Sequence, residues 1–132
     1  MALDLNDNGE VLGLKAFLGV TAPGSKVYHL YSNNYTPTDS DLIGSFTEVS
    51  SSLYAPITLT NSLWTVTTSS GTTTAVYPNI SYSFGAATTV YGYYITDTAS
   101  GTTVWWAERY STPPLLYAGS GNLTVSPAIT LD

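Results

Sequence analysis

Cysteine is absent from this chain of 132 residues, and charge is scarce. Without cysteine, the protein has neither disulfide bonds nor thiol chemistry, and cysteine usage gives no indication of its cellular compartment. Only 9% of the residues are charged, against roughly a quarter in ordinary soluble proteins. Nine carboxylates stand against three lysines and arginines, which gives a formal net charge of -6. Because such a surface repels phosphate backbones, we expect no direct contact with nucleic acid.

A long hydrophobic run is also missing. The longest apolar-leaning stretch, residues 11–22, is interrupted by Lys15 and two glycines and falls far short of a bilayer span. No basic region followed by an apolar stretch and a small-residue cleavage site opens the chain. We therefore expect no membrane partner, and a protein made and used in aqueous cytoplasm or in an assembly formed there.

Side chains that move protons or attack substrates are few. His29 is the single histidine, and it lies in a tyrosine-rich segment with no aspartate or serine at a spacing typical of a triad. A glycosidase needs only two carboxylates, but the spacing singles out no pair among Asp39, Asp41, Glu48, Asp97 and Glu108. We predict no catalytic residue, no cofactor and no enzymatic activity.

The segment DLNDNGE, residues 4–10, resembles the opening of a calcium-binding loop. Oxygen donors occupy positions one, three and five, and a glycine occupies position six. Position twelve, which should be a bidentate glutamate, is instead Lys15. We interpret the segment as a turn rich in Asp, Asn and Gly and predict no metal site. A weak, differently built calcium site near Asp4 is the alternative.

Threonine, serine, glycine and tyrosine fill the positions that charged residues usually occupy, a composition typical of strands. About seven or eight short segments bounded by turn residues predict an all-β fold, an antiparallel β-sandwich of jelly-roll type. We expect one domain over residues 26–132, preceded by an N-terminal arm or first strand region over residues 1–25. Helix is expected only as one short turn around Phe46 to Val49, capped by Asp41 or Ser45.

Two hairpins can be predicted in detail. In the first, a three-residue loop at positions 69–71 pairs Thr68 with Thr72, Val66 with Thr74 and Trp64 with Val76. The two valines and the tryptophan then share one face, which we expect to point into the core.

The second hairpin, residues 90–110, is apolar or aromatic on both faces. A loop at positions 99–101 places Ile95 opposite Trp105, Tyr93 opposite Ala107 and Tyr91 opposite Arg109. A sandwich sheet normally shows one face to water. We therefore expect one face to pack inside the domain and the other against a covering loop or a second subunit. The last pair allows a guanidinium to lie over a ring.

Binding is better supported than catalysis, because fourteen of the seventeen aromatic residues are Tyr or Trp, which are enriched at interfaces. We also expect the N-terminal stretch to contact a partner. The predicted interface consists of Tyr91, Tyr93, Trp105 and Arg109 in the hairpin and Leu12, Leu14 and Phe17 near the N-terminus.

The phrases YSNNYTPTDSDLIGSFTEVSSSLYAPITLT, VYGYYITD, WWAER and LTVSPAITL resemble small β-rich virion proteins of tailed bacteriophages. The likeness runs from about Lys26 onward and rests on the order of these phrases. It implies a virion structural protein, most like a capsid decoration (cement) protein that binds the outside of the assembled capsid and stabilises it. The implied partner is the major capsid protein, with a homo-oligomer, a trimer favoured, on the capsid exterior after assembly in the host cytoplasm.

Two alternatives stay open. The first is a tail or connector structural component, since such parts also require rigid β domains that oligomerise. The second is a carbohydrate-binding module of a phage fibre, with Tyr91, Tyr93 or Trp105 as a stacking platform for sugar rings.

Overall fold

A computed structural model describes residues 6–20 and 24–131, with the side chain of Leu131 left out. In this part of the chain antiparallel sheets dominate, so the prediction of an all-β, sandwich-like fold is confirmed, but the strands number eleven rather than the seven or eight predicted, because several are only three residues long. The strands are β1 (Lys26–Tyr31), β2 (Ile57–Leu59), β3 (Thr65–Ser69), β4 (Thr72–Val76), β5 (Ile80–Phe84), β6 (Thr88–Val90), β7 (Gly92–Thr96), β8 (Val104–Arg109), β9 (Leu115–Tyr117), β10 (Gly121–Val125) and β11 (Ala128–Leu131). The helical elements are α1 (Asp7–Phe17) and the short 3-10 turns η1 (Ile43–Ser45) and η2 (Asn61–Leu63).

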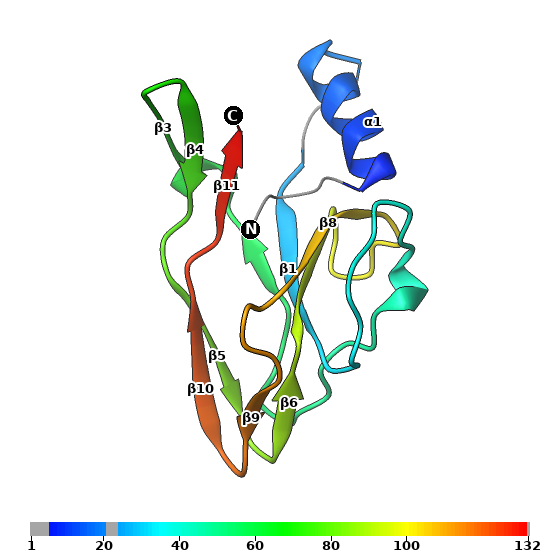
Figure 1. Ribbon diagram of the computed structural model, residues 1–132, viewed down its shortest axis with the longest axis vertical. Coiled ribbons are helices and arrows are strands. Elements are labelled where there is room, and N and C mark those ends of the chain that lie inside the picture. Colours follow the sequence, from blue (N-terminus) through cyan, green and yellow to red (C-terminus); the bar gives the residue numbers. More distant parts are fainter. Residues whose placement is uncertain (1–5, 21–23, 132) are drawn as a thin grey trace.

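Four antiparallel sheets make up the fold. The largest has the strand order β2-β1-β7-β8, and the others are β11-β4-β3, β10-β5 and β6-β9. In Figure 1 the β5-β10 and β6-β9 pairs lie at the lower end, while α1 and the β3-β4-β11 sheet lie at the upper end. Most of the described strands are rich in Thr, Val, Ile, Tyr or Trp, which suit a pleated surface.

Strand β7 is buried at all of its residues, on both faces. One face joins the main core, in which Tyr93 and Ile95 pack with side chains of β1, β5 and β8. The other face belongs to a second cluster, in which Tyr94 stacks on Phe46 with ring centres 4.9 Å apart. Phe46 comes from the segment 32–49, which we call the cover. Of the two expectations for the second face, the protein's own loop is the one that the structure shows.

The register predicted for the first hairpin is wrong by one residue. Ser69 pairs with Thr72 and Val66 with Ala75, so the loop has two residues, Ser70 and Gly71. Both have positive φ, 51° and 88°, as the two-residue turns that match strand twist require. The predicted core face is therefore wrong as well, and Val66 is 63% exposed.

The second hairpin also pairs differently from the prediction. Tyr93 lies opposite Glu108 and Ile95 opposite Trp106, with a bulge between Ile95 and Thr96. The loop between the strands is longer than predicted and spans residues 97–103. It contains a tight turn in which the Gly101 backbone N–H donates a hydrogen bond to the Thr98 carbonyl at 3.0 Å. The expected cation over a ring is nevertheless confirmed.

The Arg109 guanidinium carbon lies 5.0 Å from the centre of the Tyr91 ring. Its register partner is Gly92 rather than Tyr91, so the ring that it contacts belongs to the residue just before its partner, at the start of β7. The pair therefore survives the error in register.

Helix α1 contradicts the expectation of at most one helical turn, and of a turn or strand before position 26. The side chain of Asn6 caps it, accepting a hydrogen bond from the Asn8 backbone at 3.0 Å. Asp7 and Glu10 in the first turn and Lys15 in the last complement the helix dipole. The residues of the calcium-like motif from position 7 onward are thus helical, and Asp4 lies outside the described residues.

The short helical turn expected at Phe46 to Val49 lies slightly earlier, at η1. Neither predicted cap is used, because η1 begins after Leu42 without a side-chain cap. The carboxylate of Asp41 instead accepts hydrogen bonds from the Thr38 backbone (2.8 Å) and hydroxyl (2.9 Å) and from the Tyr35 hydroxyl (2.5 Å).

The tyrosine-rich core makes a prediction about alkaline unfolding. Burial raises the pKa of Tyr31 to about 12, and it also raises the pKa values of Tyr54, Tyr82 and Tyr93. In the unfolded chain these hydroxyl groups lose their protons at about pH 10. The stability that the buried tyrosines contribute is therefore fully present below that pH, and it is lost as the pH rises toward their pKa values in the folded protein. Tyrosinate absorbance and circular dichroism should change in one cooperative step, whereas gradual ionisation of an intact fold would contradict the prediction.

Candidate interaction surface

Helix α1 is anchored to the β domain through its first turn. The Asn6 backbone donates to the Trp105 carbonyl at 3.1 Å, and the Asn6 side-chain amide donates to the Asp41 carbonyl at 2.8 Å. The Asp7 backbone donates to the Asp39 carbonyl at 2.9 Å. These bonds join the start of the helix to both β8 and the cover.

Gly9 allows the helix to lie this close to β8. It is the buried residue of α1, and a Cβ built on it would overlap the Trp105 carbonyl oxygen. Gly13, one turn further along, has open space at the same place. The two glycines therefore have different roles, and only the first is required by the contact with the sheet.

The opposite side of α1 is apolar, and its large side chains are exposed rather than packed against the other described residues. Leu14 is 63% exposed and Phe17 88% exposed, and the same face continues through Val11, Leu18 and Val20. Positions 11, 14 and 18 follow the helical spacing that places side chains on one stripe. We call this set, Val11, Leu14, Phe17, Leu18 and Val20, the α1 apolar face. Contiguous exposed apolar surface on a soluble protein typically marks an interaction site.

A hollow of about 320 Å³ lies between α1 and the sheet. Its lining includes Trp64, Trp105, Trp106 and Ile129. The Lys26 ammonium lies 3.9 Å from the centre of the Trp105 ring and donates to the Gly24 carbonyl at 2.8 Å. Burial lowers the pKa of Lys26, and the charge of Asp97 partly opposes that effect. The hollow thus extends the apolar character of this end of the molecule behind the helix.

The predicted interface residues fall into two separate groups in the structure. Leu14 and Phe17 are exposed on the α1 apolar face, while Leu12 is half-buried. The sequence reasoning missed Val11, Leu18 and Val20. Their helical spacing was the available signal, but two glycines in the same stretch hid it.

The hairpin residues are used within the chain. Tyr93 is buried and donates to a Glu108 carboxylate oxygen at 2.8 Å. Arg109 donates to the Tyr35 carbonyl and to the Asn34 side chain, both at 2.8 Å. Tyr91 lies beneath Arg109, and Trp105 is half-buried beside Lys26. Trp105 lies beside the α1 glycines and Arg109 lines a cavity with the cap residue Asn6, but neither contact is with Leu12, Leu14 or Phe17 among the described residues, so the structure does not bring the two predicted groups together. An interface role for these residues stays a prediction.

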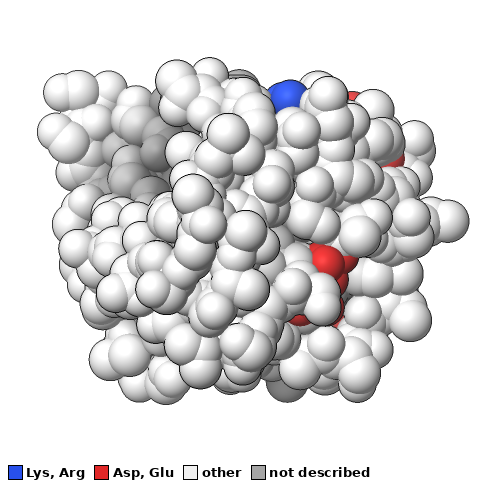
Figure 2. Space-filling view, turned by 90° about the horizontal axis from the view of Figure 1, so that it is seen from below, with Lys and Arg blue, Asp and Glu red and all other residues white. Residues whose placement is uncertain are grey.

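Charge contributes little to the surface. Figure 2, which looks at the lower end of the molecule, shows a face that is almost entirely free of Lys, Arg, Asp and Glu. Among residues 6–20 and 24–131, no three His, Asp or Glu side chains gather as metal ligands would. In the same ranges, no helix is long and apolar enough to cross a membrane.

Comparison with known proteins adds no relative. The chain matches no protein-family model, and no curated protein is significantly similar to it.

The two glycines of α1 provide a matched test of how the helix is held. Gly9→Ala should force the helix away from β8 and cost about 1–3 kcal/mol, as overpacking does. Gly13→Ala should leave stability unchanged or raise it by about 0.5–1 kcal/mol, because alanine favours helix. Thermal melting and hydrogen exchange of the α1 amides measure both effects. Equal behaviour of the two variants would show that the close approach at Gly9 is unimportant.

Proposed function

We propose that the protein is a virion structural protein of a tailed bacteriophage, a decoration protein that binds the outside of the assembled capsid and stabilises it. The observation that carries the proposal is the α1 apolar face, held rigidly by the first turn of the helix and exposed on its other side. Together with the resemblance of the chain to β-rich virion proteins, this face supports a role in permanent assembly.

Exposed leucine, valine and phenylalanine side chains favour burial against another protein. Each large apolar side chain that is removed from water contributes about 1.5–3 kcal/mol. The partner in this proposal is the major capsid protein or a neighbouring copy in a trimer. A protein that binds only the assembled shell stabilises that shell by mass action.

The charge distribution agrees with an outward position on the capsid. The chain carries a formal net charge of -6, which would oppose contact with packaged DNA. On the outside of the shell the negative charge is separated from the packaged DNA, so this repulsion does not oppose binding. A sugar-binding role is less well supported, because Tyr93 is buried and Lys26 lies over one face of the Trp105 ring.

The test uses heads of the phage that encodes the protein, prepared without it. Wild-type protein should co-sediment with expanded heads at a fixed, saturable ratio to the major capsid protein and raise their thermal stability. The double variant Leu14→Gln with Phe17→Gln should bind about a hundredfold more weakly, because it loses roughly 3 kcal/mol of apolar burial. Its own melting temperature should change little, since both side chains are exposed.

The matched control is the double variant Val66→Gln with Leu116→Gln, which changes two exposed apolar residues far from α1 in sequence. It should bind heads as the wild type does. Undiminished binding by the α1 variant would exclude the helix as the contact. Failure of the wild type to bind expanded heads would exclude decoration and direct the same assay to tails and connectors.

A further inference from the structure

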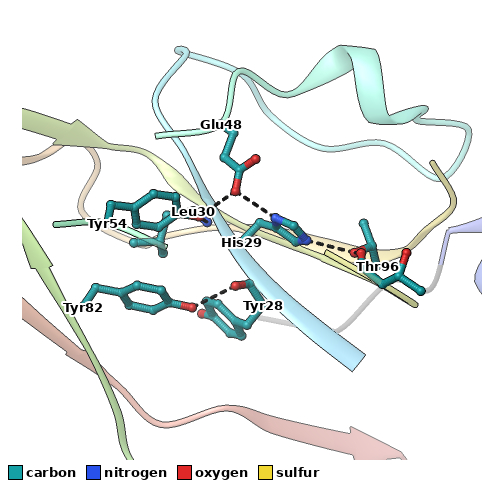
Figure 3. A network of polar contacts seen from close by, with 8 residues as sticks. Tyr28, His29, Leu30, Glu48, Tyr54, Tyr82 and Thr96 are labelled. Atoms are coloured by element: carbon teal, nitrogen blue, oxygen red, sulfur yellow. Dashed lines mark hydrogen bonds and ion pairs between the residues drawn. The ribbon is translucent and has the colours of Figure 1, made fainter. Parts of the chain in front are cut away.

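The single histidine lies at the centre of a polar network that joins three parts of the fold and reaches the surface at Glu48, whose side chain is 39% exposed. His29 in β1 is 2% exposed. Its Nδ1 lies 2.9 Å from Glu48 Oε1 in the cover, and its Nε2 lies 2.9 Å from Thr96 Oγ1 in β7. Its ring stacks on Tyr94, with ring centres 4.6 Å apart and planes 5° apart. Figure 3 shows Glu48 and Thr96 on opposite sides of the imidazole.

The proton on Nε2 follows from the partner of Thr96. The Thr96 hydroxyl lies 2.5 Å from the Thr98 carbonyl oxygen, which can only accept. The single hydroxyl hydrogen therefore points to that carbonyl, and Thr96 Oγ1 is an acceptor toward the imidazole. Nε2 must carry a hydrogen to make its bond.

The contact at Nδ1 requires a second proton. Glu48 Oε1 accepts from the Tyr54 hydroxyl at 3.0 Å, and that hydroxyl accepts from the Leu30 backbone at 2.9 Å. Tyr54 thus has no hydrogen left for another acceptor. A bare Nδ1 facing an ionised carboxylate at 2.9 Å would place two lone pairs against each other. One proton must lie between them, whichever of the two atoms carries it.

We propose that the proton shared by His29 and Glu48 is a pH-sensitive clasp that holds the cover on the central sheet. The pair carries one proton more than a neutral histidine beside a carboxylate. Loss of that proton as the pH rises removes a charge-assisted hydrogen bond and leaves two acceptors in contact. The contribution of the clasp to the closed state is therefore present while the pair is protonated and is lost at higher pH.

The position of Glu48 explains why the cover responds. Glu48 forms an isolated bridge with Tyr31, and its neighbours on both sides bond to β1. The Ser32 backbone donates to the Thr47 carbonyl at 2.8 Å, and the Val49 backbone donates to the Leu30 carbonyl at 2.9 Å. Two residues before Glu48, Phe46 stacks on Tyr94. Weakening the bond at Glu48 therefore loosens the segment that shields the second face of β7.

The other titratable groups that face the clasp stay neutral over the same range. They are Tyr94 of β7, Tyr54 of the segment before β2, and Tyr82 of β5. Burial raises the pKa of each one, and the charge of Glu48 adds to the effect. Among the described groups around the imidazole, His29 and Glu48 are the pair whose contact requires the shared proton.

Hydrogen exchange of residues 32–49, measured between about pH 5 and about pH 8 and corrected for intrinsic rates, tests the clasp. Amides of β5 and β10 serve as the internal reference. Protection of the cover in the wild type should fall about tenfold relative to the reference as the pH rises, as expected for one charge-assisted hydrogen bond. Nitrogen chemical shifts of the His29 ring at the lower pH should report hydrogens on Nε2 and toward Nδ1.

Glu48→Gln is the matched variant, because its amide can donate to Nδ1 while a neutral His29 keeps its Nε2 hydrogen. Cover protection in this variant should be independent of pH over the same range. The proposal is overturned if the wild-type cover keeps constant protection relative to β5 and β10, or if the variant shows the same pH dependence as the wild type. Because both measurements use the isolated protein, their outcome is independent of binding to heads.

Discussion

Strand β7 lies between β1 and β8 with every residue buried, so apolar side chains must reach it from both faces. On one face tyrosines of β1 and β5 complete the main core, and Tyr28 stacks on Tyr93 with ring centres 4.4 Å apart. On the other face, within residues 6–20 and 24–131, no second layer of strands packs against Tyr94, and the cover supplies Phe46 instead. The need to shield β7 twice thus accounts for the long connection between β1 and β2, which would otherwise be an unusually long loop in a compact domain.

The core is built from tyrosine where many β proteins use phenylalanine or leucine, and the hydroxyl groups act as cross-links. Tyr82 donates to the Tyr28 carbonyl at 2.9 Å, and the Thr60 backbone donates to the Tyr77 hydroxyl at 2.9 Å. Each bond joins segments that are far apart in sequence. Because a buried hydroxyl without a partner is costly, these bonds favour one arrangement of the sheets, and they do so without charged residues.

The cover also connects the interior to the proposed binding surface. Its residues 39 and 41 accept hydrogen bonds from Asp7 and Asn6 at the start of α1, while Glu48 at its other end contacts His29. Helix, cover and central sheet are therefore joined by a continuous set of polar contacts. A change at the histidine has a physical route to the anchor of the helix, through a segment that is held mainly by hydrogen bonds and a few aromatic contacts.

The sequence by itself determined the fold class, the two apolar faces of residues 90–110 and the contact of the Arg109 guanidinium with the Tyr91 ring, because these depend on strand composition and local alternation. The register of the two hairpins could not be predicted from the sequence. It depends on a positive φ at Ser70 and on a bulge beside Thr96, and both are stabilised by contacts across the sheet. Helix α1 was missed because Gly9 lowers helix propensity locally, yet only a glycine allows the approach to β8. The contact between His29 and Glu48 likewise arises only when the cover folds back over the sheet. Only the tertiary structure decides such features, because each one requires two segments that are distant in sequence to approach closely. Contacts of this kind leave no pattern in the local sequence.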